Sequence, residues 1–314
     1  IALPSMLKRG YDKFISIGSI ATAGGLGILI PPSVIMILYG VFAGESIGQL
    51  YAGGVFPGLL LSSLYITYVL VKSYLKPSLC PSIPKKERLS FNEKLRTLWL
   101  LLPPLFLIVI VLGSLFIGIC TPTEAAAIGV AGSIVCALLR KRFSLEVLKD
   151  SCRETLRLSG MVIWIIVGGS CFSSIYTSIG AVELIKNVTA SLGVSKYVIL
   201  AGTQFILFIL GCLMDPGGIL MITTPVFVPV IKMLGFDPVW YGVLFVVNME
   251  MAYITPPFGF NLFYMKSVVP PGVTMQDIYR SIVPFVVLQA IGLVICIIFP
   301  EIILWLPQKL FGEG

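Results

Sequence analysis

Long stretches of this chain contain only uncharged, mostly apolar residues. Residues 97–123, 158–182 and 281–300 carry no charged side chain. Each run approaches or exceeds the ~20 residues that an α-helix needs to cross the hydrocarbon of a bilayer. A β-barrel would instead show segments of about ten residues in which apolar and polar positions alternate. The pattern therefore predicts an all-α polytopic membrane protein.

The apolar segments also give a first map of the helices. Spans are expected over 14–40, 51–75, 97–119, 122–139, 155–177, 238–265 and 279–304, with a short interfacial helix over 181–193. Residues 196–214 and 217–233 are two apolar arms on either side of "MDPGG". Asp, Pro and Gly together are typical of a turn. The arms are therefore expected to form one hairpin over 196–233.

Basic residues lie mostly on one side of this map. Composition is 57% hydrophobic and 12% charged, with a net charge of +7. Eighteen of the 22 Lys and Arg residues fall on the side that includes the segments 72–96 and 140–157. Cytoplasmic loops carry such an excess, so this side is assigned to the cytoplasm and the charge does not indicate a nucleic-acid partner. The assignment requires the hairpin to be re-entrant and puts the C-terminus in the periplasm.

Two parts of the sequence match each other at an offset of 225 residues. Pro4, Gly10, Asp12, Pro31, Pro32 and Tyr39 are repeated as Pro229, Gly235, Asp237, Pro256, Pro257 and Tyr264. Chance would give roughly two or three identities over this length. The charge count orients the copies oppositely, which predicts inverted repeats. The end of the first repeat is expected over residues 1–75 and the second repeat over 97–314. A cytoplasmic loop and arm over 76–96 connects them. The rest of the first hairpin is expected to precede residue 1.

Both copies carry a Pro-Pro pair in the middle of a span, "ILIPPS" and "YITPPF". Proline has no N–H and displaces the carbonyl one turn earlier, so carbonyls near each pair lose their helical partners. Bare carbonyls at bilayer depth are tolerated where they are buried in protein or line a ligand site. Broken helices in inverted repeats are typical of secondary transporters, where they bind small cations. Kinks that serve packing alone are the alternative.

Few ionisable groups lie at membrane depth. Asp215, at the hairpin tip, could bind a cation or could simply cap the following arm. Glu250 is the only charged residue in 238–265 and could serve coupling or pair with a basic group. Glu124, in the capping box "TPTE", is expected to cap a helix. The chain has no histidine, which excludes His-dependent catalysis, and the scattered cysteines are expected to be apolar filler.

Three stretches carry a family resemblance: "GGLGILIPPSVIMILYGVFAGESIGQLYAGGVFPGLLL", "GICTPTEAAAIGV" and "VVNMEMAYITPPFGFNLF". Together they resemble the large membrane subunit of tripartite ATP-independent periplasmic (TRAP) transporters, most closely the sialic-acid branch. The resemblance implies a sodium-driven elevator importer in a bacterial inner membrane. It also implies a small membrane subunit, separate or fused, and a periplasmic binding protein that delivers a carboxylate.

The resemblance also implies sites. The implied Na⁺ ligands are the carbonyls of Gly27, Ile30 and Pro32 at the first break, and Ala252, Thr255 and Pro257 with Asp215 at the second. The candidates for substrate contact or gating are Ser33, Gly217, Gly218, Thr223, Thr224, Gly259 and Asn261.

Three functions are weighed against these features. The first is sodium-coupled import of sialic acid through a binding protein. The second is import of a C4-dicarboxylate or another organic anion, in one version without a binding protein. The third, an intramembrane enzyme or channel, is disfavoured because Asp215 and Glu250 are far apart in sequence and no histidine is present. In the expected mechanism the hairpins and broken helices move as one body against spans 51–75 and 279–304, linked by amphipathic arms over 84–96 and 144–157.

Overall fold

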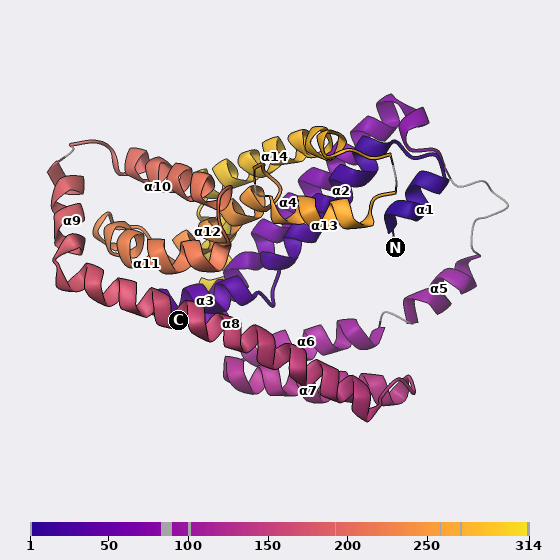
Figure 1. The fold of residues 1–314 in the computed structure, drawn as a ribbon, viewed down its shortest axis with the longest axis horizontal. Coiled ribbons are helices and arrows are strands. Elements are labelled where there is room, and N and C mark those ends of the chain that lie inside the picture. Colours follow the sequence, from indigo (N-terminus) through magenta and orange to yellow (C-terminus); the bar gives the residue numbers. More distant parts are fainter. Residues whose placement is uncertain are drawn as a thin grey trace. The chain divides into compact units, whose positions relative to one another are not determined.

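Every regular element in the part of the chain that the structure describes is a helix (Figure 1). The computed structural model describes residues 2–82, 90–99, 102–191, 193–257, 259–270 and 272–312. The helices are α1 (Ala2–Lys8), α2 (Lys13–Gly25), the 3₁₀ helix η1 (Leu26–Ile28), α3 (Val34–Ala43), α4 (Ile47–Leu75), the 3₁₀ helix η2 (Pro77–Leu79), α5 (Phe91–Trp99), α6 (Leu102–Phe116), α7 (Pro122–Leu139), α8 (Leu145–Ser178), α9 (Ala181–Ser191), α10 (Lys196–Gly211), α11 (Pro216–Met233), α12 (Pro238–Tyr253), α13 (Phe260–Val268), α14 (Met275–Ile298) and α15 (Glu301–Phe311). The predicted all-α class is confirmed.

Among the described helices, α4, α7, α8, α11 and α14 are long and apolar enough to cross a bilayer. They have 29, 18, 34, 18 and 24 residues, which at 1.5 Å rise per residue spans about 27 Å or more. Shorter apolar helices include α3, α6 and α10. The polytopic character is therefore confirmed.

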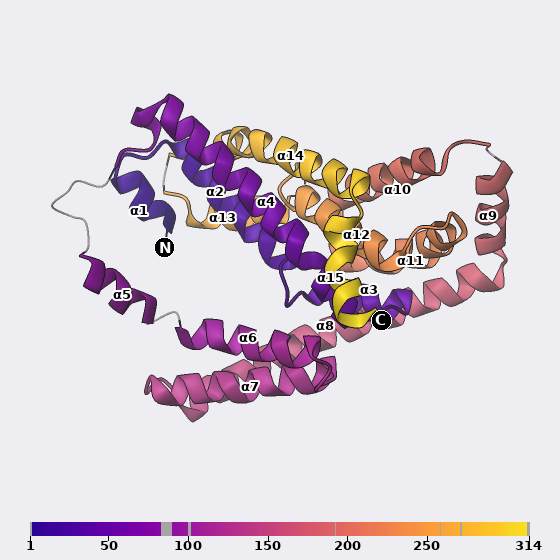
Figure 2. The same ribbon diagram turned by 180° about the vertical axis from the view of Figure 1, so that it is seen from behind.

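The chain forms two compact units, residues 1–82 with 172–314, and residues 83–171. In the first unit α2, α4 and α14 pack against one another, as both views of the ribbon show (Figures 1 and 2). Helix α12 packs on α4, α10 and α14, and its residues from Val239 to Ala252 are all buried. In the second unit α6 packs on α7. The predicted division into two membrane repeats stays a prediction.

Backbone features of residues 10–32 recur 225 residues later in the chain. The Asp12 carboxylate caps α2 by accepting from the amides of Phe14 and Ile15, and Asp237 caps α12 in the same way. The glycines two residues earlier, Gly10 and Gly235, both adopt positive φ, 78° and 76°. The peptide bonds Pro31–Pro32 and Pro256–Pro257 are both cis. The two segments therefore share backbone conformation as well as residues.

Two helix boundaries differ from the sequence-based map. The last helix, expected over 279–304, is two helices, because Phe299 is non-helical (φ −117°, ψ 78°) and Pro300 has no N–H to continue α14. Helix α15 packs mainly on α4. From Leu145 onward, the segment 144–157 and the span after it form the single helix α8, which no proline interrupts.

Capping boxes begin helices in the second unit. Thr121 and Glu124 cap α7 reciprocally, so the capping role expected of Glu124 is confirmed. Glu93 accepts from the Ser90 amide at 2.8 Å and donates its own amide to the Ser90 hydroxyl at 3.3 Å. The Ser90 amide and hydroxyl hold the pKa of the Glu93 carboxyl below its usual range. Helix α5 covers only part of the predicted arm over 84–96, since residues 83–89 lie outside the described part of the chain.

Candidate functional site

The first break separates η1 from α3. The carbonyls of Gly27 and Ile30 accept no hydrogen bond from any described residue. For Gly27 the reason is local, because the amide of Ile30 bonds back to Leu26 and Pro31 has no N–H. The Ser33 hydroxyl donates to the carbonyl of Ile28 and caps α3 by accepting from the Met36 amide. The break thus leaves carbonyl oxygens with free lone pairs, and such oxygens suit a small hard cation.

Two glycines of α4 allow the first break to pack closely. A Cβ at Gly54 would lie 2.7 Å from the carbonyl oxygen of Leu29, and one at Gly58 would lie 2.5 Å from Cγ1 of Ile30. The Tyr51 hydroxyl, also on α4, donates to the Ser33 carbonyl at 3.3 Å. Leu29 and Ser33 are consequently buried, and α4 fixes the path of the break.

The second break separates α12 from α13. The Thr255 amide donates to the carbonyl of Ala252 at 3.0 Å, and its hydroxyl donates to the carbonyl of Met251 at 2.7 Å. The carbonyls of Thr255 and Pro257 accept no bond from a described residue. Gly259 has φ 42° and begins α13, where a side chain would also meet Leu262 at 2.7 Å. Of the three predicted carbonyls here, only that of Ala252 is already bonded.

The end of α10, which is the first arm of the hairpin over 196–233, lies against the second break. A Cβ at Gly211, the last residue of α10, would lie 2.4 Å from Cβ of Ala252. One turn before Ala252, Asn248 donates from Nδ2 to the carbonyl and to Oε1 of Gln204, each at 2.8 Å. The structure therefore brings the end of α10 to the predicted ligand Ala252.

Asp215 is the N-cap of α11. One carboxylate oxygen accepts from the amides of Gly217 at 2.9 Å and Gly218 at 3.3 Å. The capping alternative is thus confirmed for Asp215, while a second role as a cation ligand stays a prediction. The two glycine amides that were candidates for substrate contact donate to this carboxylate.

The two threonines of α11 lie in different surroundings. Thr223 is buried and its hydroxyl donates to the carbonyl of Ile219 at 2.8 Å within the helix. Thr224 lines a cavity of about 510 Å³ between α3, α9 and α11, together with Lys186 and Lys232. Since none of the other predicted site residues lines this cavity, it is separate from the breaks.

The two broken helices touch each other. Asn261 of α13 donates from Nδ2 to the carbonyl of Ala21 in α2 at 3.2 Å. Glu250 of α12 lies against Gly25 of α2, where a Cβ would be 3.1 Å from Glu250 Cγ. Asn261, a predicted site residue, therefore joins the segments that flank both breaks.

The sequence-based search missed the partners of Glu250. The Tyr65 hydroxyl on α4 and Nε2 of Gln289 on α14 both donate to Glu250 Oε1, at 3.3 and 3.1 Å. Gln289 could have been noticed, because it is the only amide side chain in the uncharged run 281–300. Tyr65 has no distinguishing feature in the sequence.

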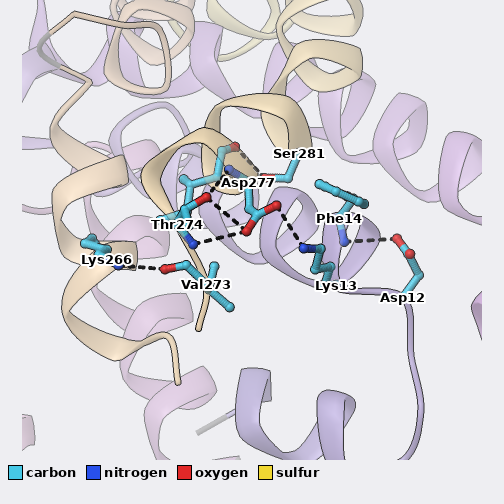
Figure 3. A network of polar contacts seen from close by, with 9 residues as sticks. Asp12, Lys13, Phe14, Lys266, Val273, Thr274, Asp277 and Ser281 are labelled. Carbon is cyan, nitrogen blue, oxygen red and sulfur yellow. Dashed lines mark hydrogen bonds and ion pairs between the residues drawn. The ribbon is translucent and has the colours of Figure 1, made fainter. Parts of the chain in front are cut away.

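A second polar network joins the starts of α2 and α14 (Figure 3). Lys13 pairs with Asp277 at 2.8 Å, and Asp277 also closes a capping box with Thr274. Lys266 donates to the carbonyl of Val273 at 2.6 Å. The network fixes the approach of the chain to α14.

The family model described as "Tripartite ATP-independent periplasmic transporter, DctM component" matches residues 1–302. The chain belongs to this TRAP transporter family. It is a large permease subunit, a multi-pass protein of a bacterial inner membrane and a transporter rather than an enzyme, as the sequence predicted.

The curated relatives of this TRAP permease carry different substrates in their names. A "C4-dicarboxylate TRAP transporter large permease protein DctM" of Pseudomonas aeruginosa is 34% identical, over 99% of this chain and 71% of its own. An "Isethionate TRAP transporter permease protein DctMQ" of Oleidesulfovibrio alaskensis is 31% identical, over 96% and 47%. A "Sialic acid TRAP transporter permease protein SiaT" of Haemophilus influenzae is 29% identical, over 99% and 49%.

Proposed function

We propose that this TRAP permease imports a small organic carboxylate into the cell, driven by a sodium gradient. The observation that supports it best is the pair of helix breaks. At each break, carbonyl oxygens lack a hydrogen-bond donor among the described residues: Gly27 and Ile30 at the first, Thr255 and Pro257 at the second. Carbonyls at helix breaks in transporters bind Na⁺.

In this mechanism Gly27, Ile30 and Pro32 hold one Na⁺, and Ala252, Thr255 and Pro257 hold another, with Asp215 fixing the nearby hairpin tip. Bound Na⁺ supplies positive charge close to an anionic substrate. Ser33 orders the start of α3, and Gly259 and Asn261 order the start of α13. Binding therefore requires both breaks and the hairpin tip to be ordered together.

The proposed partners are a small membrane subunit and a periplasmic binding protein. The family description, a component of a tripartite transporter, supports both. The name DctMQ of one relative supports a membrane subunit that is fused in some relatives. The strong bias of Lys and Arg to one side of the spans supports a periplasmic C-terminus. An elevator movement of the hairpins and broken helices completes the proposal.

Uptake into proteoliposomes tests this function. The complete membrane complex is given labelled sialic acid or labelled succinate, with an inward Na⁺ or choline gradient and with binding protein added or omitted. The proposal expects uptake of one substrate only with Na⁺ and binding protein together. Uptake of succinate but not sialic acid selects the C4-dicarboxylate alternative. Equal uptake in choline refutes sodium coupling, and equal uptake without binding protein refutes the partner.

A further inference from the structure

Three buried side-chain oxygens on α2, α12 and α14 have no hydrogen-bond partner among the described residues. They are Oγ1 of Thr22, Oε2 of Glu250 and Oε1 of Gln289. All three residues are 0% exposed. Buried polar atoms are almost always bonded, so a group of such atoms indicates a missing ligand.

Glu250 and Gln289 are in direct contact. Gln289 donates from Nε2 to Glu250 Oε1 at 3.1 Å, and the Tyr65 hydroxyl donates to the same oxygen at 3.3 Å. Both donors therefore reach one carboxylate oxygen and leave the other, Oε2, without a partner. The amide oxygen of Gln289 is held beside the carboxylate because it shares a carbon atom with Nε2.

The packing of α2 on α14 places Thr22 at the same level. Gly18 of α2 meets Ser281 and Phe285 of α14, where a Cβ would lie 2.3 Å from the Ser281 carbonyl oxygen. Thr22 follows Gly18 by four residues and Gln289 follows Phe285 by four, which is about one helical turn in each helix. Gly25, three residues after Thr22, is the residue that meets Glu250.

The charge of Glu250 has no counterpart nearby. None of the ion pairs between described residues involves Glu250. A buried carboxyl group is paired with a cationic group, coordinates a metal ion or takes up a proton, because an isolated buried charge is costly. A proton on Glu250 removes the charge and is the alternative to a cation, whereas a water molecule supplies no compensating charge. A bound cation satisfies the oxygens and the charge together.

We propose that Glu250, Gln289 and Thr22 form a binding site for one dehydrated monovalent cation, distinct from the carbonyls at the two breaks. Oε2 of Glu250 and Oε1 of Gln289 are its anionic and neutral ligands, and the Thr22 hydroxyl completes the cluster. The choice of Na⁺ as the ion rests on the proposed function. The site lies where α2 and α12 both approach their breaks and joins these helices to α14.

Sodium binding to the purified membrane complex tests the site. Radiolabelled Na⁺ is titrated against wild type, Glu250→Gln and Thr22→Val. Ser281→Ala is the matched control, because it removes a buried hydroxyl from α14 that donates to the carbonyl of Ile278 within the same helix. Melting temperatures in choline confirm that each variant is folded.

The expected result is that Glu250→Gln binds one Na⁺ fewer per chain than wild type. Thr22→Val, which removes an uncharged ligand, weakens the binding of one Na⁺ by about tenfold, as expected for a neutral hydrogen-bonding group. Ser281→Ala leaves the number and the affinity of the bound Na⁺ ions unchanged. If Glu250→Gln is unfolded, Thr22→Val decides the question by the same readout.

Two results overturn the site and are distinguishable. If Glu250→Gln and Thr22→Val keep the number and affinity of Na⁺ ions seen in wild type, only the Glu250 site is refuted. If wild type itself binds no Na⁺, the sodium coupling of the proposed function is refuted with it.

Discussion

The contact between Gly211 and Ala252 predicts that a single methyl group will separate the hairpin from the second break. In Gly211→Ala the added Cβ would lie 2.4 Å from Cβ of Ala252 and 3.3 Å from Cε of Met249. Non-bonded carbons pack at about 3.5 Å or more, so α10 must move by about 1 Å relative to α12. Overpacking of this kind destabilises a protein by about 1–3 kcal/mol.

The displacement acts on the predicted sodium site as well as on stability. Gly211 is the last residue of α10, and the backbone carbonyl of Ala252 is one of those predicted to bind Na⁺ at the second break. If the displaced hairpin costs the bound state about 1.4 kcal/mol, the apparent Na⁺ affinity falls about tenfold. We therefore expect Gly211→Ala to lower the melting temperature and to raise the Na⁺ concentration required for half-maximal uptake.

A control on the same helix separates packing from helix propensity. A Cβ at Gly202 would meet no atom within 4 Å. Gly202→Ala should therefore raise stability slightly, since Ala favours a helix over Gly by about 1 kcal/mol, and leave the Na⁺ dependence unchanged. The assays are thermal unfolding in detergent and Na⁺-dependent uptake in proteoliposomes. Equal behaviour of the two variants would refute the argument from close packing.

Three further predictions concern the other contacts. Gly54→Ala places a Cβ 2.7 Å from the Leu29 carbonyl oxygen, so we expect a loss of about 1–3 kcal/mol in thermal unfolding; an unchanged melting temperature would contradict the close approach of α4. Asp215→Asn keeps a good N-cap and should retain stability, whereas Asp215→Ala should lose about 1 kcal/mol; weaker Na⁺ binding by the folded Asn variant would reveal a second role as a ligand. Lys13→Ala should lower the melting temperature only slightly because the pair is partly exposed. Asp277→Asn should lower it no further, because an Asn side-chain oxygen still accepts from the amide of the N-cap Thr274; a larger loss for Asp277→Asn than for Lys13→Ala in thermal unfolding would contradict this order.

Local chemistry made much of the fold predictable from the sequence. The start of α7 follows from Thr121, Pro122 and Glu124, because their contacts lie within one helical turn. The breaks at Pro31 and Pro256 follow equally locally, since proline removes a donor wherever it stands. Such features require no knowledge of which helices become neighbours.

Contacts between distant residues could not be predicted in this way. Tyr65 and Gln289 both bond to Glu250, at separations of 185 and 39 residues. Their pairing depends on the packing of α4, α12 and α14, which similar apolar surfaces do not specify by pattern alone. The same applies to Gly211, whose importance arises only from the position of Ala252 on another helix.

The contacts of Glu250 also bear on the proposed elevator movement. Glu250 belongs to α12, which is expected to move, whereas Tyr65 and Gln289 belong to α4 and α14, which are expected to stay in place. An elevator movement of α12 relative to α4 and α14 must therefore break both hydrogen bonds and open the proposed cation site. A bound cation would then stabilise the position seen here, and its release would accompany the step. A disulfide engineered between α12 and α14 should consequently stop uptake while leaving Na⁺ binding intact, and uptake that survives the crosslink would show that these helices move together.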